Sequence, residues 1–429
     1  MKRWVVIPVV VVVLAVLGGW LWMAGQRVGH VVTPEVGALT SEALADPALV
    51  ARGAYLAAAG DCAGCHSVRG GLPYAGGRSV PTPFGNIPGP NLTPDPETGI
   101  GRWSFADFWR ALHYGQRKDG QWLYPAFPFT SYTKVTPEDA RAIYAYLRSL
   151  PAVRRETDAA KLSFPYNLRS TLAVWRARYF RPGGFQPDAG QSAAWNRGAY
   201  LVQGLGHCNE CHAPRNALGA TTGAWLSGGE IPRQDWYAPD LSMQANGGLQ
   251  GWTARDVVDL LKTGHATKGA AFGPMADVVA DSTQHLGDAD LDAIATYLAS
   301  LPPRQPRPAP RSAFDVKRIT AAGEKVYRQH CADCHGGDGR GVAGVYPPLD
   351  GNSAVTEPTG INAMRTVLLG GFPPVTAGNP RPYSMPPYAQ QLDDSDVALV
   401  VSYIRQAWGN KASIVRPEQV GKYRHTPID

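Results

Sequence analysis

The chain has 429 residues, of which 44% are hydrophobic, 10% aromatic and 18% charged, so it carries enough apolar material for packed cores and is not a disordered protein. Its 48 glycines and 37 prolines follow no period, which predicts short helices joined by long irregular loops rather than a barrel or a coiled coil. The net charge of +6 comes without a long lysine or arginine block, so we expect no nucleic-acid partner.

The chain begins with an apolar segment. Residues 4–24 are uncharged and mostly apolar, and Lys2 and Arg3 precede them. As a helix, this run would be about 31 Å long, enough to cross the hydrocarbon core of a bilayer. We therefore expect residues 1–25 to be a single N-terminal anchor in the cell inner membrane, with the rest of the chain on the periplasmic side. A cleaved signal peptide is the alternative.

All six cysteines fall in three copies of one string, Cys-x-x-Cys-His. The copies are Cys62, Cys65 and His66; Cys208, Cys211 and His212; and Cys331, Cys334 and His335. In c-type haem attachment, two thiols spaced in this way form thioethers with the vinyl groups, and the adjacent histidine is the proximal iron ligand. A zinc site would need four N or S ligands, but it would not need a histidine directly after each second cysteine. A thioredoxin-like pair would need a βαβ pattern, which is absent here. The strings predict three covalently bound haem c groups.

The surroundings of the three strings also repeat. A short helix containing Gly and Tyr precedes each string, and a closing helix with an apolar face follows each one, after a capping signal at Thr136, Asp288 or Asp393. We therefore expect domains at 48–150, 192–301 and 315–409, a connector at 151–191, a Pro/Arg-rich linker at 302–314 and a tail at 410–429. The connector alternates aromatic residues with arginines, which favours packing between the first two domains, with an interfacial membrane helix as the alternative.

The six methionines limit the choice of the sixth iron ligand. Met275 and Met385 lie in proline-containing loops shortly before the closing helices of the second and third repeats, where a loop can fold over the distal face of a haem. We predict that they are distal ligands, which would make these two haems high-potential electron carriers. Met243 and Met364 follow their haem histidines too closely, so we expect them to be packing residues.

The first repeat has no methionine in the corresponding place. Phe127 occupies it, in the run Tyr-Pro-Ala-Phe-Pro-Phe, and phenylalanine cannot bind iron. The first haem is then five-coordinate, or it takes His113, or it takes a ligand from elsewhere. The plainer interpretation of His113 is a residue on a helix surface. In every case, we expect this haem to have a different spectrum and a lower reduction potential than the other two haems.

Each repeat also carries a Pro-x-Leu step after its haem string, beginning at Pro90, Pro239 and Pro347. In small c-type cytochromes, a proline carbonyl at this place accepts the N–H of the proximal histidine and sets its tautomer. We expect the same arrangement here.

With these motifs, the chain resembles the multihaem cytochrome c subunits of bacterial membrane-bound dehydrogenase complexes, the alcohol, gluconate, sorbitol and aldehyde dehydrogenases among them. The resemblance covers residues 48–409 and includes the segments Asn91-Leu-Thr-Pro-Asp, Trp195-Asn-Arg-Gly-Ala-Tyr-Leu and Trp236-Tyr-Ala-Pro-Asp-Leu. It implies an all-α fold of three tandem class I cytochrome c domains with long irregular loops, behind an N-terminal transmembrane helix.

The resemblance also implies a role. The subunit would accept electrons from a catalytic dehydrogenase subunit, which is a quinoprotein, a flavoprotein or a molybdoprotein, and pass them through its haems to ubiquinone or a terminal oxidase. Phe127 departs from the alcohol and gluconate type, which has methionine there, and chains with phenylalanine resemble the partners of molybdenum hydroxylases and aldehyde dehydrogenases.

Two other functions remain open. One is a peroxidase-like enzyme that uses an open first haem, and the other is a cytochrome subunit of a terminal oxidase. No dinucleotide-binding loop, P-loop or Ser/His/Asp arrangement is found, so we expect no substrate-oxidising site and no catalytic residue in this chain. Binding of CO, or a reaction with peroxide, would distinguish the enzyme.

Overall fold

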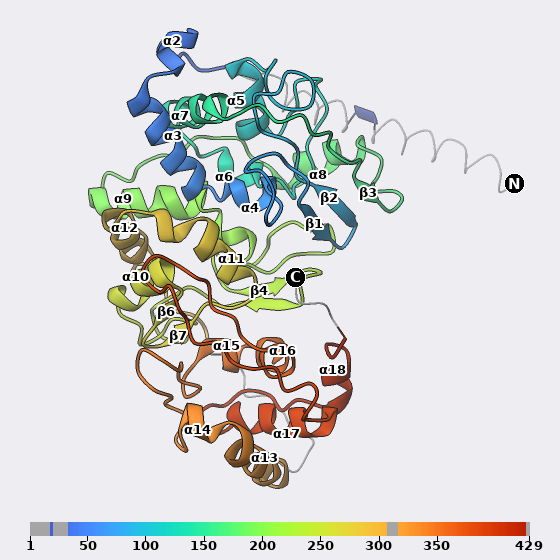
Figure 1. Cartoon of the computed structure of the whole chain (residues 1–429), viewed down its shortest axis with the longest axis vertical. Helices are drawn as coiled ribbons and strands as arrows, with labels where there is room; N and C mark the ends of the chain where they lie inside the picture. The colour runs from blue at the N-terminus through green and yellow to red at the C-terminus, as the bar shows by residue number, and fades with distance from the viewer. Residues whose placement is uncertain (1–17, 20–32, 307–315, 426–429) are drawn as a thin grey trace, which may run out of the picture. The chain divides into compact units, whose positions relative to one another are not determined.

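The computed structural model describes residues 18–19, 33–306 and 316–425, and it divides into two compact units (Figure 1). The described part of the first unit comprises residues 18–19, 33–57, 65–186 and 217–220. The second comprises residues 58–64, 187–216, 221–306 and 316–425. Both units are mostly helical and contain only short strands, which agrees with the expected helical fold.

The first unit holds short helices around one small sheet. The helices are α2 (Ser41–Leu44), most of α3 (Pro47–Ala59), the last two residues of α4 (Cys62–His66), α5 (Phe105–Tyr114), α6 (Phe129–Tyr132), α7 (Pro137–Ser149) and α8 (Thr171–Tyr179). The antiparallel sheet has the order β1 (Ser79–Thr82), β2 (Gly85–Pro88), β3 (Lys161–Leu162). As predicted, Thr136 caps the closing helix α7, because its side chain accepts a hydrogen bond from the Asp139 N–H and Pro137 follows it.

The connector packs on the first unit. Its strand β3 extends the sheet of that unit, and the Ser163 N–H donates to the Phe84 carbonyl at 2.8 Å. Farther along, the Gly183 N–H donates to the Thr133 hydroxyl at 3.0 Å. A side chain of α8 contacts one of α6, where the rings of Trp175 and Phe129 meet edge to face. Phe180 of the connector is therefore a core residue of the first unit, whereas Phe164 is 78% exposed.

The second unit contains most of the segment around the second haem string. Its helices are α9 (Ala193–Tyr200), the π-helical turn η1 (Leu201–Leu205), the 3₁₀ turn η2 (Cys208–Glu210), α10 (Ala254–Thr263), α11 (Pro274–Asp281), the 3₁₀ turn η3 (Thr283–His285) and α12 (Asp288–Ala299). Two antiparallel hairpins accompany them, β4 (Gly229–Ile231) with β5 (Trp236–Ala238) and β6 (His265–Ala266) with β7 (Gly269–Ala270). Gly287, rather than Asp288, is the N-cap of the closing helix α12.

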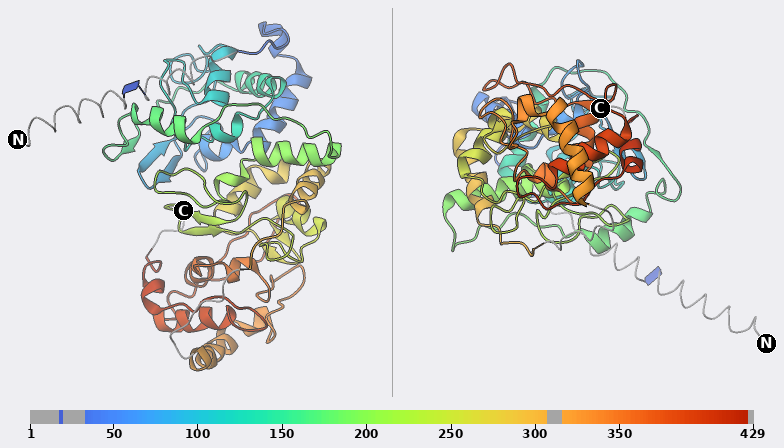
Figure 2. Two further views of the ribbon diagram at one scale, coloured as in Figure 1. Left: turned by 180° about the vertical axis from the view of Figure 1, so that it is seen from behind. Right: turned by 90° about the horizontal axis from the view of Figure 1, so that it is seen from below.

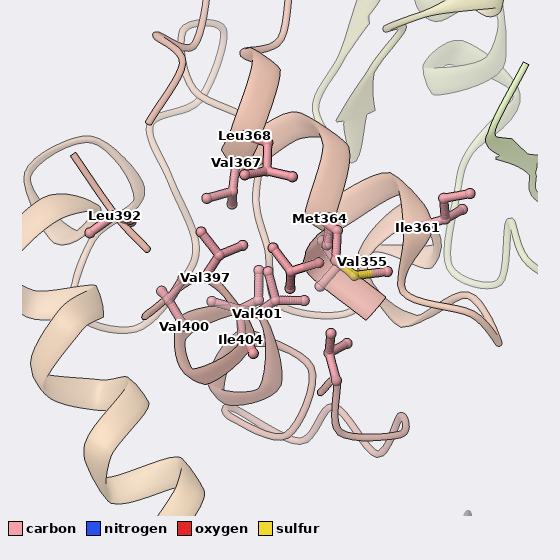
Figure 3. Packing of buried hydrophobic residues seen from close by; sticks show 14 of the residues in the cluster. Val355, Ile361, Met364, Val367, Leu368, Leu392, Val397, Val400, Val401 and Ile404 are labelled. Carbon is pink, nitrogen blue, oxygen red and sulfur yellow. The ribbon is translucent and has the colours of Figure 1, made fainter. Parts of the chain in front are cut away.

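The segment around the third string has its own core. Its helices are α13 (Val316–His330), α14 (Ala332–His335), α15 (Ser353–Thr356), α16 (Ile361–Leu369), α17 (Asp394–Ile404) and α18 (Pro417–Gly421). Helix α13 packs across α17 (Figure 2). Figure 3 shows valine, leucine and isoleucine side chains of α15, α16 and α17 meeting in one cluster, with Met364 among them.

One helix crossing occurs three times. In each repeat, a glycine of the helix before the haem string lies against the backbone of the closing helix, next to a tyrosine. A Cβ atom at Gly53, Gly198 or Gly323 would lie 1.9, 1.9 or 2.2 Å from the carbonyl oxygen of Ala142, Ala293 or Leu399. The tyrosines are Tyr146, Tyr297 and Tyr403. Only glycine allows this close approach, so the crossing explains why the Gly-containing helix recurs.

Within the second unit, an amide joins the second and third segments. The Asn362 side chain accepts a hydrogen bond from the Tyr237 N–H and donates one to the Tyr237 carbonyl, both at 2.8 Å. Beside it, the guanidinium of the buried Arg365 lies 5.0 Å from the ring centre of Trp236. These contacts link α16 to β5.

The expectation of an inner-membrane protein with one N-terminal transmembrane anchor has to be corrected. Among the residues that the structure describes, no helix combines the length and the apolar character that crossing a membrane requires. The run at 4–24 on which the expectation rested lies outside the described residues, apart from residues 18 and 19, and so does most of the linker at 302–314.

Candidate haem sites

Each haem string begins a tight helical turn. The first string forms α4, the third forms α14 with Cys331 as its N-cap, and the second forms η2, which begins after His207 in a left-handed conformation with φ of 37°. A helical turn brings the two cysteines of a pair to the same side of the backbone, with the histidine directly after them. Both thiols of a pair can therefore meet the edge of one macrocycle.

The three proximal histidines share one hydrogen bond. Nδ1 of His66 and of His212 lies 2.7 Å from the carbonyl oxygen of Pro90 and of Pro239, and the corresponding distance from His335 to Pro347 is 3.2 Å. Since a carbonyl can only accept, Nδ1 must carry the proton and Nε2 is left with its lone pair. The structure thus confirms the predicted Pro-x-Leu contact in all three repeats.

Burial keeps these imidazoles neutral. Loss of solvent lowers the pKa of His66, His212 and His335, while the hydrogen bond to the proline carbonyl raises each pKa in part. A neutral imidazole is the form that binds a metal ion. The histidines are thus in the protonation state that iron ligation needs at neutral pH.

Three of the six thiols have raised pKa values. Burial raises the pKa of Cys208 to about 12 and that of Cys211 and Cys331 to about 11, so these thiols do not ionise at neutral pH. Within the described ranges, no three His, Cys, Asp or Glu side chains gather into a group that could hold a metal ion. The donor set at each site, a pair of thiols and one imidazole with a free Nε2, fits covalently attached haem.

The candidate distal methionines differ in their local structure. Met385 lies in a loop, as expected, and its backbone N–H and carbonyl pair with those of Gly371 at 2.8 and 3.0 Å. Met275 lies in the first turn of α11 rather than in a loop, because Pro274 is pre-set for the first position of a helix. Both side chains are half-buried.

The structure describes two further methionines, Met364 and Met243. Met364 is only 1% exposed and points into the cluster of α15, α16 and α17 (Figure 3), which confirms its predicted packing role. Met243 is half-buried in the loop that follows β5.

In the first repeat, Phe127 is half-buried and its ring centre lies 5.3 Å from that of Tyr132. His113, at the end of α5, is 6% exposed, so its interpretation as a helix-surface residue is wrong. Its ring stacks on Trp109 at 4.2 Å, and its Nδ1 is buried without a hydrogen-bond partner. Burial lowers the pKa of His113 to about 4, which leaves a neutral imidazole in the core.

Comparison with known proteins identifies the family. The family model for cytochrome c matches three segments of the chain, at residues 50–151, 196–302 and 320–408. The chain belongs to the cytochrome c family. Each match contains one haem string, together with most of the helix before it and the closing helix after it.

Its relatives include cytochrome subunits of dehydrogenases. The cytochrome c subunit of a quinone alcohol dehydrogenase from Gluconacetobacter polyoxogenes is 40% identical over 399 residues, covering 89% of this chain and 85% of the relative. The cytochrome c subunit of gluconate 2-dehydrogenase from Pantoea cypripedii is 40% identical over 405 residues, covering 88% and 90%. A nicotinate dehydrogenase subunit from Pseudomonas putida is 42% identical over 406 residues, covering 91% of this chain and 33% of the relative.

Two features of the described residues were not predicted from the sequence. The glycines at the helix crossings were visible as a recurring Gly–Tyr pattern, but the pattern alone does not show which helix the glycine meets. Arg176, on α8 of the connector, is a fully buried residue among the rings of Trp122, Phe129 and Phe180. Its only sequence signal was the alternation of arginines with aromatic residues, which is equally typical of an exposed amphipathic helix.

Proposed function

We propose that this chain is a triheme electron-transfer subunit. Each Cys-x-x-Cys-His string would hold one haem c through two thioethers, with His66, His212 and His335 as the proximal iron ligands. The observation that carries the proposal is the hydrogen bond from each histidine Nδ1 to a proline carbonyl, because it leaves Nε2 free for iron at all three sites. The bound haems would supply a one-electron Fe(III)/Fe(II) couple at each site.

The electrons would come from a separate catalytic dehydrogenase subunit and leave to ubiquinone or a terminal acceptor. The cytochrome subunits of alcohol and gluconate dehydrogenases, similar to this chain over most of their length, support such a partner. The sequence offers no motif for binding or oxidising an organic substrate, so this chemistry belongs to the partner, whether it is a quinoprotein, a flavoprotein or a molybdoprotein.

The three sites would differ at the sixth ligand. Met275 and Met385 are the proposed distal ligands of the second and third haems, and a thioether ligand raises the potential of a haem. At the first site, Phe127 offers no donor, and His113 is the proposed alternative, with its neutral ring already buried. The first haem would then have the lowest potential of the three.

Haem counting tests the attachment sites. We expect three haems per chain from intact mass and from the haem absorbance of the denatured protein, and two after both cysteines of one string are replaced by serine. Replacing Met275 or Met385 by leucine should remove the charge-transfer band of one Met-ligated ferric haem, whereas Met364→Leu should leave it unchanged. Fewer than three haems in the intact chain would refute the triheme proposal.

The transfer role is tested on the complex purified with its own dehydrogenase. Substrate of that dehydrogenase should reduce all haems, and a water-soluble ubiquinone analogue should then reoxidise them. A matched complex in which both cysteines of one string are replaced lacks one haem. Loss of electron transfer from the dehydrogenase to the quinone in this complex shows that the missing haem lies on the electron path. Haems that stay oxidised while the dehydrogenase turns over with an artificial acceptor would refute the role.

One observation favours a second function. Because Phe127 cannot bind iron, the first haem is a candidate for an open site, as a peroxidase-like enzyme would need. Binding of CO to the reduced first haem, together with peroxide turnover that depends on this haem, would support the enzyme. An unchanged spectrum under CO would exclude it.

A further inference from the structure

A buried ion pair follows the proline that contacts the proximal histidine of the second repeat. Asp240 comes directly after Pro239, whose carbonyl oxygen lies 2.7 Å from Nδ1 of His212. The Asp240 side chain is 4% exposed, and Arg304 Nε donates to its Oδ2 at 2.6 Å. Burial lowers the pKa of His212, whereas the Pro239 carbonyl and then the negative charge of Asp240 raise it in part. The carboxylate therefore acts electrostatically on the imidazole that is proposed to bind iron.

Both partners of the ion pair are held by further hydrogen bonds. One terminal nitrogen of Arg304 donates to the Trp225 carbonyl at 2.7 Å, and the Arg304 backbone N–H donates to the Ala245 carbonyl at 2.9 Å. The Ser242 N–H donates to Oδ1 of Asp240 at 2.7 Å. Each oxygen of the carboxylate thus has a donor, and the guanidinium is fixed where it offsets the negative charge.

The first repeat makes the same contact with an uncharged side chain. Asn91 takes the place of Asp240, and its Oδ1 accepts a hydrogen bond from the Thr93 N–H at 2.9 Å. Its side-chain nitrogen donates to the Val153 carbonyl at 2.7 Å. Val153 and Arg304 are equivalent, since each comes two residues after the first proline that follows a closing helix. An amide and a backbone carbonyl thus replace the ion pair.

Only the second repeat has a charged residue directly after the contacting proline. The residue is Asn91 in the first repeat, Asp240 in the second and Pro348 in the third. Asn91 shows that a neutral side chain is enough to hold this turn, and a buried ion pair adds little net stability over uncharged groups. The charges of the second repeat point to a consequence other than folding.

That consequence is the reduction potential of the second haem. Fe(III) carries one more positive charge than Fe(II), so a nearby carboxylate without a partner stabilises Fe(III) and lowers the potential. A guanidinium without a partner has the opposite effect. Charges act strongly in a buried site, because the effective dielectric constant is lower there than in water. A balanced pair leaves the potential near the value that the axial ligands set.

We propose that Asp240 and Arg304 are positioning residues of the second haem site. The Asp240 side chain holds the turn that presents the Pro239 carbonyl to His212, and Arg304 cancels the charge that Asp240 brings to this place. The start of the linker at 302–314 would then contribute to the potential of the second haem. This inference rests on the proposed attachment of a haem to the second Cys-x-x-Cys-His string.

The test is a redox titration of the holoprotein at pH 8. The second haem is identified as the one that is lost when both cysteines of the second string are replaced by serine. Arg304→Gln should lower the potential of this haem, because it leaves the Asp240 carboxylate without its counter-charge. Asp240→Asn should raise the potential, because the guanidinium is then the unbalanced charge. The double variant should return close to the wild-type value.

The chain offers a matched control. Arg255 and Asp259 form an ion pair on α10 of the same segment, and the Arg255 side chain is 80% exposed. Arg255→Gln removes the same charge as Arg304→Gln, but water and salt screen this pair. It should leave the potential of the second haem unchanged.

Haem counting and thermal unfolding of the same samples separate the possible failures. If both single variants keep three haems and lose thermal stability, but their second-haem potentials match that of Arg255→Gln, the pair only holds the fold and the proposal is overturned. Shifts of the same sign in both variants overturn it as well, because they report a distorted turn rather than a charge. If only one single variant folds, the sign of its shift decides. A wild-type chain that lacks the second haem refutes the proposed attachment instead.

Discussion

Adding one methyl group at a helix crossing should destabilise the first unit. In Gly53→Ala, the new Cβ would lie 1.9 Å from the Ala142 carbonyl oxygen and 2.7 Å from Tyr146 Cβ. Since real Cβ atoms stay at least 3.0 Å from such atoms, α3 and α7 must separate by about 1.1 Å. Overpacking of this kind costs about 3 kcal/mol, and the better helix propensity of alanine returns about 1 kcal/mol.

The expected net loss is about 2 kcal/mol in the free energy of unfolding, or about 4–8 °C in the melting temperature of the unit. Calorimetry of the holoprotein measures it directly. Gly184→Ala is the matched control, because Gly184 is in the same unit and a methyl group added there would meet nothing within 4 Å, so its stability should change by less than about 0.5 kcal/mol. A Gly53→Ala protein as stable as Gly184→Ala would refute the close crossing.

Three further predictions concern the caps, the core and the distal segment. Burial alone would raise the pKa of Asp256, but hydrogen bonds from Thr253 and Thr267 lower it overall, so Asp256→Ala should cost about 1 kcal/mol at pH 7 in urea unfolding. That loss should shrink as the pH falls below 4, because the wild type then loses the same interaction. Met364→Ala should cost about 2–5 kcal/mol in the same assay, since the side chain is fully buried. Phe127→Met should raise the potential of the first haem in a redox titration and add a Met–iron charge-transfer band, and an unchanged spectrum would show that residue 127 does not face the iron.

The sequence predicted those parts of the site that depend on neighbours along the chain. The spacing of Cys62, Cys65 and His66 and the later Pro90 were enough to predict the contact between the histidine and the proline carbonyl. The cap at Thr136 was equally local, since an N-cap needs only the first turn of its helix.

The rest depends on contacts between distant parts of the chain. His113 has the pattern of a surface residue on α5, and only the packing around that helix shows that it is buried. The same holds for Arg176, because its aromatic neighbours come from α6, from the run before it and from the end of the connector. Periodicity indicates that a face is apolar, but it does not indicate what covers that face.

The amide pair between Asn362 and Tyr237 has a consequence for how fast the second and third segments can exchange an electron. One side chain uses its donor and its acceptor on the backbone of a single residue, so both bonds form in only one relative orientation of the segments. Partners that must first diffuse and dock spend much of their encounter time in unproductive orientations. Here the second and third segments are held together within one chain. Electron transfer between their proposed haems would therefore depend on the distance between the haems and on the driving force. No diffusional docking would be needed, so the rate would depend little on viscosity or salt.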